Sequence, residues 1–174
     1  MRADAPSVGT TAGRHAGWLL LALAVLALDQ ATKWAALDGL DPYRPVAVTP
    51  FFNLVLVWNR GVSFGMFAEA GDHGPWLLTL LAAAIGAFLV VWLLRETRAV
   101  TRLALWLVLA GACGNLIDRV RFGAVVDFLD FHAFGYHWPA FNVADSAIVV
   151  GAGLILLDSL VLSPTKTKLG RGER

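Results

Sequence analysis

Four apolar segments constrain the fold of this 174-residue chain more than any other feature. They run at about 17–37, 75–94, 102–121 and 139–162 and contain few charges. As a helix rising about 1.5 Å per residue, a segment of this length crosses the roughly 30 Å hydrocarbon core of a bilayer. The chain is 57% hydrophobic and 16% charged, which is more apolar than a typical soluble domain. We therefore predict an α-helical membrane protein with four transmembrane helices.

The remaining segments indicate two tails and a small sheet around one membrane domain, 17–162. Residues 1–16 have no periodic apolar face and are predicted to be a disordered tail, while 163–174 form a basic tail. Within about 40–70, an aromatic and β-branched run, Phe51–Trp58, predicts a strand resting against helices or lipid. A turn and a second expected strand, 62–65, follow it.

The distribution of basic residues sets the expected orientation. By the positive-inside rule, the more basic side faces the cytoplasm, which places both termini there and residues 38–74 and 121–138 outside. The inner set is Arg2, Arg14, Arg95, Arg98, Arg102, Lys166, Lys168, Arg171 and Arg174, and the outer set is Arg44, Arg60, Arg119 and Arg121, with Lys33 near the outer set.

Polar side chains gather where the last two apolar segments approach the outer surface. A carboxylate at the bilayer centre costs about 2.5–3.5 kcal/mol on insertion scales, so such groups are expected to face an interior. Asn115, Asp118 and Arg119 share one face of the third predicted helix. Asn142 and Asp145 repeat that spacing at the start of the fourth. We expect the two faces to meet.

Two aspartates of this region are predicted to be catalytic. Asp127 follows a turn at Gly123 and lies between apolar residues, so it can lie at the same depth in the membrane as Asp145. Two carboxylates held close cannot both ionise, so one keeps a proton and stands as an acid beside a base. Such a pair can deprotonate a water that attacks a peptide carbonyl and protonate the leaving nitrogen.

Other polar residues permit more than one interpretation. Asp29 and Lys33, at i and i+4, fit a structural ion pair with Lys33 snorkelling outward, but Asp29 equally fits the edge of an active site. Asn59 and Arg60 fit a simple turn, or a site that holds a peptide backbone or an anionic head group. Cys113, the single cysteine, is expected to be buried and inert.

Composition and spacing argue against several function classes. A net charge of +1 gives no support for nucleic-acid binding. His132 and His137, considered with Asp127 and Asp130, match no familiar ligand spacing, so no metal or other cofactor is expected, and their roles stay open. The basic start before the first apolar run also fits a secretory signal peptide, but no small-x-small cleavage site follows it.

Two non-hydrolytic functions are weaker alternatives. A proton-coupled transporter would place ionisable groups near the midplane with access from both faces. Here the polar residues crowd toward one face, and only Asp158 lies near the other end. A non-catalytic scaffold would explain four helices, but not aspartates and asparagines directed at one site.

The chain also resembles bacterial lipoprotein signal peptidase, the signal peptidase II family. The motifs that carry this resemblance occur in the family's order, from the first helix to the fourth: Asp29–Lys33, Asn59–Gly65, Gly114–Arg119, Val126–Phe128 and Phe141–Asp145. The resemblance implies that Asp127 and Asp145 are the catalytic aspartates. Together with the neighbouring motif residues, it implies a substrate-binding set of Asp29, Asn59, Arg60, Gly61, Asn115, Asp118, Arg119 and Asn142.

The resemblance implies a fold and a reaction as well. The family has four transmembrane helices with a small extracytoplasmic β-cradle, expected here at about 40–70. Its members lie in the bacterial inner membrane and cleave prolipoproteins before the diacylglyceryl-modified cysteine; the cyclic peptide globomycin inhibits them. Membrane lipid and lipidated substrates are therefore the expected partners of a monomer. Two small-residue departures, at Ala110–Ala112 and Val62–Ser63, concern packing rather than chemistry.

Overall fold

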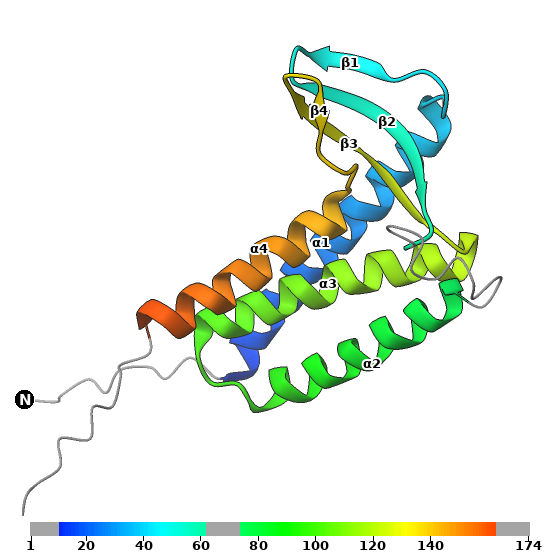
Figure 1. The fold of residues 1–174 in the computed structure, drawn as a ribbon. Helices are drawn as coiled ribbons and strands as arrows, with labels where there is room; N and C mark the ends of the chain where they lie inside the picture. Colours follow the sequence, from blue (N-terminus) through cyan, green and yellow to red (C-terminus); the bar gives the residue numbers. More distant parts are fainter. Residues whose placement is uncertain (1–10, 62–73, 163–174) are drawn as a thin grey trace, which may run out of the picture.

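The structure is a computed structural model that describes residues 11–61 and 74–162. Figure 1 shows the helices packed side by side, with a small sheet at one end of them. The elements in chain order are α1 (Thr11–Gly39), β1 (Val46–Thr49), β2 (Phe52–Asn59), α2 (Gly74–Arg95), α3 (Ala99–Phe122), β3 (Val125–Ala133), β4 (Tyr136–His137), α4 (Val143–Leu157) and a π-helical turn (Asp158–Leu162) that continues α4.

Three helices of the described chain are long and apolar enough to cross a membrane: Ala16–Gly39, Ala99–Phe122 and Val143–Val161. The corresponding part of α2, Thr79–Arg95, is shorter. The expectation of membrane helices is therefore confirmed for α1, α3 and α4, while a fourth span through α2 stays a prediction.

Helix α3 is central and packs against each of the other helices. Leu105 and Leu109 of α3 form an apolar cluster with Leu89 and Leu93 of α2. α3 also lies close to the backbone of α4, since a Cβ atom on Gly151 of α4 would lie 2.7 Å from the backbone oxygen of Ala104. Small residues at a helix crossing allow this close approach in membranes, where van der Waals packing drives association.

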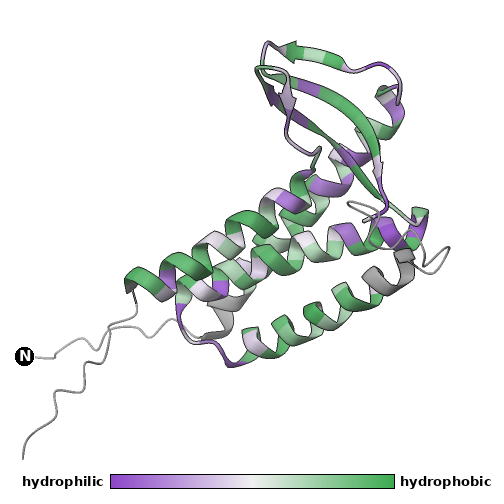
Figure 2. Ribbon diagram, in the orientation of Figure 1, coloured by the Kyte–Doolittle hydropathy of each residue, from purple (hydrophilic) through white to green (hydrophobic). Residues whose placement is uncertain are grey.

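Large apolar side chains are exposed on the outer helix surfaces. Figure 2 shows the helices mostly in the hydrophobic colour, with interspersed polar residues. Leu80 and Phe88 of α2 are 67% and 65% exposed. Such surfaces are stable in contact with lipid tails rather than water. Cys113 of α3 is also exposed, so the expectation that it is buried was wrong; it lies on the side of α3 that other helices leave uncovered.

The sheet is antiparallel in the order β1-β2-β3-β4. β2 confirms the strand expected from Phe51–Trp58. It pairs with β1 on one side and on the other with β3, which lies in the connection between α3 and α4. Val57 pairs with Asp127 and Trp58 with Val126. The cradle expected at 40–70 therefore draws half of its strands from a later part of the chain. The strand expected at 62–65 lies outside the described residues.

Two predicted helix starts differ from the structure by four residues or more. α1 begins at Thr11, so 11–16 are helical rather than part of a disordered tail. α4 begins at Val143 rather than at Pro139, because Asn142 takes the N-cap position with extended backbone angles. Residues 1–10 and 163–174, expected as tails, lie outside the described residues.

Candidate active site

Asp127 lies on β3 with 1% of its surface exposed. Two side-chain amides donate to its carboxylate: Asn59 Nδ2 to Oδ2 at 2.9 Å and Asn142 Nδ2 to Oδ1 at 2.7 Å. Asn59 reaches it from the end of β2 and Asn142 from the start of α4. A buried carboxylate requires donors of this kind, because unpaired it would lose its hydration without compensation.

The turn after β2 fixes the direction of Asn59. The N–H of Gly61 donates to Asn59 Oδ1 at 2.8 Å, and Gly61 has φ of 74°, a left-handed conformation that glycine adopts without a steric penalty. Because the amide oxygen accepts from the turn, the amide nitrogen is left to donate to Asp127. The turn at Asn59–Gly61 therefore orients the Asn59 amide toward Asp127.

Asp145 lies in the first turn of α4. Its backbone N–H donates to Asn142 Oδ1 at 2.9 Å, and its own Oδ2 accepts from the Asn142 N–H at 3.2 Å. This reciprocal pair is a capping box, which satisfies backbone donors at a helix start. Asn115 Nδ2 of α3 donates to Asp145 Oδ1 at 2.7 Å. The carboxylate is thereby held from two helices.

Asn142 links the two aspartates. Its side-chain nitrogen donates to Asp127, while its side-chain oxygen accepts from the backbone of Asp145. The same nitrogen also lies 3.2 Å from Asn115 Oδ1. One buried amide therefore joins β3, α3 and α4 at the point where the predicted catalytic residues come together.

Burial raises the pKa of Asp127 to about 6, and the negative charge of Asp145 adds to this effect. The hydrogen bonds from Asn59 and Asn142 and the charge of Lys33 act in the opposite direction but do not cancel it. Desolvation disfavours the ionised carboxyl, and a nearby like charge does the same. Asp127 therefore retains a proton more readily than an ordinary aspartate.

A buried ion cluster lies beside these residues. Lys33 Nζ is 2.9 Å from Asp29 Oδ2 and 2.9 Å from Asp118 Oδ2, and it donates to Asn115 Oδ1 at 3.0 Å. Lys33 is 2% exposed. The expectation that Lys33 snorkels outward was therefore wrong, because two carboxylates from α1 and α3 compensate the desolvation of its ammonium group.

The carboxylates of this cluster also hold the backbone. Asp29 Oδ1 accepts from the N–H of Ala144 at 2.8 Å, and Asp118 Oδ2 accepts from the N–H of Val126 at 3.1 Å. A Cβ atom on Gly114 would overlap the Asp29 carboxylate, which explains the glycine at that position. Asp29 and Asp118 are 0% and 2% exposed, so they lie beneath the site rather than on its surface.

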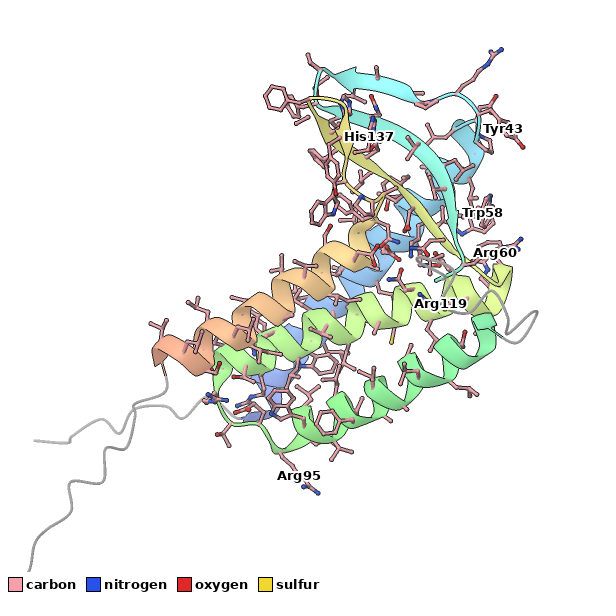
Figure 3. All side chains as sticks on the ribbon, viewed as in Figure 1. Tyr43, Trp58, Arg60, Arg95, Arg119 and His137 are labelled. Atoms are coloured by element: carbon pink, nitrogen blue, oxygen red, sulfur yellow. The ribbon has the colours of Figure 1, made fainter. Side chains whose placement is uncertain are left out.

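The two arginines of the predicted binding set lie in different places. Arg119 is half-buried and donates to Asn115 O at 3.4 Å, and Figure 3 shows it beside α3 on the side toward the sheet. Arg60 is exposed and lines a hollow of about 270 Å³ with Trp58, Phe122 and Ala124. Arg119 thus contacts the backbone of Asn115, whose side chain donates to Asp145.

Comparisons with known proteins identify the family of this chain. The family model described as signal peptidase (SPase) II matches residues 21–161. This chain belongs to the signal peptidase II family.

Two similar relatives carry the name lipoprotein signal peptidase. One from Burkholderia mallei is 48% identical over 154 residues, covering 87% of this chain and 92% of the relative. One from Polynucleobacter necessarius is 44% identical over 145 residues, covering 82% and 88%. A solved structure described as a bacterial membrane enzyme has a TM-score of 0.72 and 30% identity, covering 91% of this chain and 95% of that one. As a signal peptidase, the chain is a protease of a bacterial membrane.

An apolar hollow of about 580 Å³ adjoins Asp145 in this family member. It runs along α4, and Val149 and Val150 on its wall are exposed toward the region that lipid would occupy. The lining residues are Trp138, Pro139, Ala140, Phe141, Asp145, Ser146, Val149 and Val150. The hollow offers an apolar surface with one carboxylate at its edge.

His137 pairs with Asp130 rather than with the site. Its Nδ1 lies 2.9 Å from both carboxylate oxygens, and Asn53 Nδ2 donates to the same group. Burial acts to raise the pKa of Asp130, but these hydrogen bonds outweigh it and lower the pKa. His132 stacks on His137 with ring centroids 4.8 Å apart. The group braces β3 against β2 and β4.

Lys33 and Gln30 are the polar residues near the site that the sequence analysis did not assign to it. Gln30 Nε2 donates to Asp118 Oδ1 at 3.3 Å and to Asp29 Oδ2 at 3.2 Å. The signal for Lys33 was present in its i, i+4 spacing with Asp29, which already indicated an ion pair. The sequence does not reveal that this pair faces α3.

Proposed function

We propose that this chain is a membrane-embedded aspartyl endopeptidase that removes signal peptides from prolipoproteins, cutting before the diacylglyceryl-modified cysteine. Family membership and the names of the relatives support the substrate class. The observation that carries the proposal is the junction at Asn142, whose side-chain amide donates to the carboxylate of Asp127 on a strand and whose backbone N–H donates to the carboxylate of Asp145 on a helix. Within the described chain, the hydrogen-bond donors to the two carboxylates are neutral groups of Asn59, Asn115 and Asn142, which leave both carboxyl groups available to exchange protons.

In the proposed reaction, Asp145 accepts a proton from water as the water oxygen attacks the scissile carbonyl carbon. Asp127 donates its proton to the peptide nitrogen as the C–N bond breaks. The raised pKa of Asp127, about 6, supports its role as the acid, since a general acid must hold its proton before the bond breaks. No cofactor is required: after each turnover Asp145 releases the proton it took from water and Asp127 takes up a proton, which restores the starting state.

The apolar hollow beside Asp145 supports a substrate with lipid chains. A diacylglyceryl group can stay in the bilayer against Val149 and Val150 while the scissile bond lies at Asp127 and Asp145, the catalytic dyad. Asn59, Arg60, Gly61 and Arg119 would contact the peptide, and globomycin would occupy the same space. The burial of Asp29 and Asp118 supports an indirect role for them, through the backbone of Ala144 and Val126.

We further propose that four helices span the inner membrane, that both termini are cytoplasmic and that the site lies on the periplasmic side of a monomer. The first described residues of α1 and the last of α4 lie at the same end of the bundle, opposite the sheet (Figure 1). This arrangement supports a common side for the termini, and the basic residues near them favour the cytoplasm.

The direct test is cleavage of a synthetic diacylglyceryl-modified precursor peptide by the purified chain in detergent. We expect one cut before the lipidated cysteine, no cleavage of the unmodified peptide and inhibition by globomycin. Turnover should fall as the pH rises through about 6, because Asp127 then loses the proton it donates. Absence of cleavage under conditions where a relative is active would contradict the proposal and favour a transporter or scaffold.

A further inference from the structure

Lys33 of α1 is the least expected member of the site. An ammonium group has three N–H donors and no acceptor. Within the described chain its three close partners are all oxygens: Asp29 Oδ2 at 2.9 Å, Asp118 Oδ2 at 2.9 Å and Asn115 Oδ1 at 3.0 Å. The donors of Lys33 are therefore fully used, and one of them is directed at a residue that contacts the dyad.

The side-chain amide of Asn115 can face Lys33 with either its oxygen or its nitrogen, and Lys33 determines which of the two it is. Because Lys33 only donates, the Asn115 atom that faces it must be the oxygen. Asn142 Nδ2 also points at this oxygen, at 3.2 Å. The Asn115 nitrogen is then left to face Asp145 Oδ1 at 2.7 Å. With the amide turned over, two oxygens would face each other at Asp145.

The carboxylates bound by Lys33 also hold the backbone immediately before each aspartate of the dyad. Asp29 accepts from the N–H of Ala144, the residue before Asp145. Asp118 accepts from the N–H of Val126, the residue before Asp127. One ammonium group therefore connects the α1 and α3 carboxylates that position the two halves of the dyad.

We propose that Lys33 is a positioning residue for cleavage, which fixes the Asn115 amide and draws together the carboxylates that hold the dyad backbone. The inference rests on the proposed two-aspartate function. It assigns Lys33 no contact with substrate: its effect passes through Asn115 to the carboxylate that accepts the proton of water. Gln30, which donates to both carboxylates, supports the same cluster from α1.

A test must separate positioning from folding, since removing one partner of a buried ion pair strongly destabilises the fold. The useful variant is the double substitution Lys33→Met with Asp29→Asn. With Asp118 retained, the cluster keeps a net charge of −1, as in the wild type, and the new amide oxygen can still accept from Ala144. The donor to Asn115 is lost. Asp158→Asn, a buried carboxylate at the other end of α4, is the matched control.

Steady-state cleavage of the diacylglyceryl-modified peptide should show kcat reduced about 100-fold in the double variant, with KM within about threefold, because a mispositioned catalytic group affects the chemical step. The control should keep kcat. A folded double variant, judged by its melting temperature and circular dichroism, that keeps kcat within threefold of wild type would overturn the inference.

The pH profile gives a second readout that a merely structural role would not change. Lys33 lowers the pKa of Asp127, whose other charged neighbour is Asp145, while Lys33 itself faces Asp29 and Asp118. Lys33→Met alone removes a positive charge, so the pH above which turnover falls should increase. Adding Asp29→Asn removes a negative charge, so this pH should decrease again. An unmoved limb in Lys33→Met would contradict the inference. If Asp127→Asn and Asp145→Asn both stay active, the proposed function fails instead.

Discussion

Asn142 Nδ2 donates to Asp127 Oδ1 at 2.7 Å, which joins the N-cap of α4 to the middle of the sheet. The same Asn142 side chain accepts from the N–H of Asp145. The side-chain amide of Asn142 thus connects β3 to the first turn of α4, beside the backbone hydrogen bonds between Leu129 and Phe141. The two carboxyl groups are held as one unit by the fold, although 18 positions separate them in the chain.

If the aspartates act as this unit, Asp127→Asn and Asp145→Asn should each reduce kcat by about 10³-fold or more, and combining them should add little. Either variant loses the ability to exchange a proton with water. Cleavage of the lipidated peptide measures the effect, and globomycin binding reports that the site is still formed. Asp38→Asn, an exposed carboxylate of α1, is the control that should keep full turnover. Near-native turnover of either dyad variant would rule out the mechanism.

Asp127 should also make stability depend on pH. Its pKa is 3.8 as a reference and about 6 in the fold, so the folded state binds the extra proton between these values. The contribution of Asp127 to the free energy of unfolding is therefore fully present below about pH 4 and is lost as the pH rises through about 6. The difference in unfolding free energy, wild type minus Asp127→Asn, should rise by up to about 3 kcal/mol from pH 7 to pH 4. A flat or opposite difference in detergent unfolding would contradict this.

The sequence was sufficient to predict three of the membrane helices and one strand, because each rests on a local pattern. The catalytic pair stays a prediction. Apolar runs reveal α1, α3 and α4 directly, and the aromatic and β-branched run reveals β2. The shared face of Asn115 and Asp118 follows from helical spacing, and so does its direction toward an interior.

The parts that could not be predicted depend on long-range pairing. The sequence predicts a loop at β3, because a strand there would place a carboxylate on each face, Asp127 on one and Asp130 on the other. Pairing with β2 and the bridge between Leu129 and Phe141 make it a strand. Lys33 looks exposed in sequence because its second carboxylate partner, Asp118, is 85 positions away. The exposure of Cys113 depends on which face of α3 its neighbours leave open.

The orientation in the membrane can be tested by reporter fusions. A fusion at Arg98, between α2 and α3, should read cytoplasmic, and one at Asp41, between α1 and β1, should read periplasmic. A fusion at the C-terminus should also read cytoplasmic, because the basic residues gather on that side. The inverted pattern would place the dyad on the wrong side for an exported substrate.

The close packing of α3 against α4 predicts different effects for two neighbouring glycines. A Cβ atom on Gly151 would lie 2.6 Å from Val108 Cγ2 and 2.7 Å from Ala104 O, whereas one on Gly153 would meet nothing within 4 Å. Gly151→Ala should lower the unfolding free energy by about 1–3 kcal/mol through overpacking. Gly153→Ala, its matched control, should be neutral or slightly stabilising, because alanine favours helix. Equal melting temperatures for the two variants would contradict this packing.

Asp158 tests whether every buried carboxylate in the bundle belongs to the chemistry. It lies thirteen positions beyond Asp145, about 20 Å along the helix at a rise of about 1.5 Å per residue. Thr101 Oγ1 donates to its Oδ2, and Arg98 Nη1 is 2.9 Å from the same oxygen, so its partners tie the end of α4 to the start of α3. Asp158→Asn should lower stability by about 1–3 kcal/mol, as expected when a buried charge-assisted hydrogen bond is lost. Turnover on the lipidated peptide should stay within about twofold of wild type, because the substitution leaves the Asn142 junction unchanged. A loss of turnover comparable to that of Asp145→Asn, in protein that expresses and melts normally, would instead favour a transport pathway through the bundle.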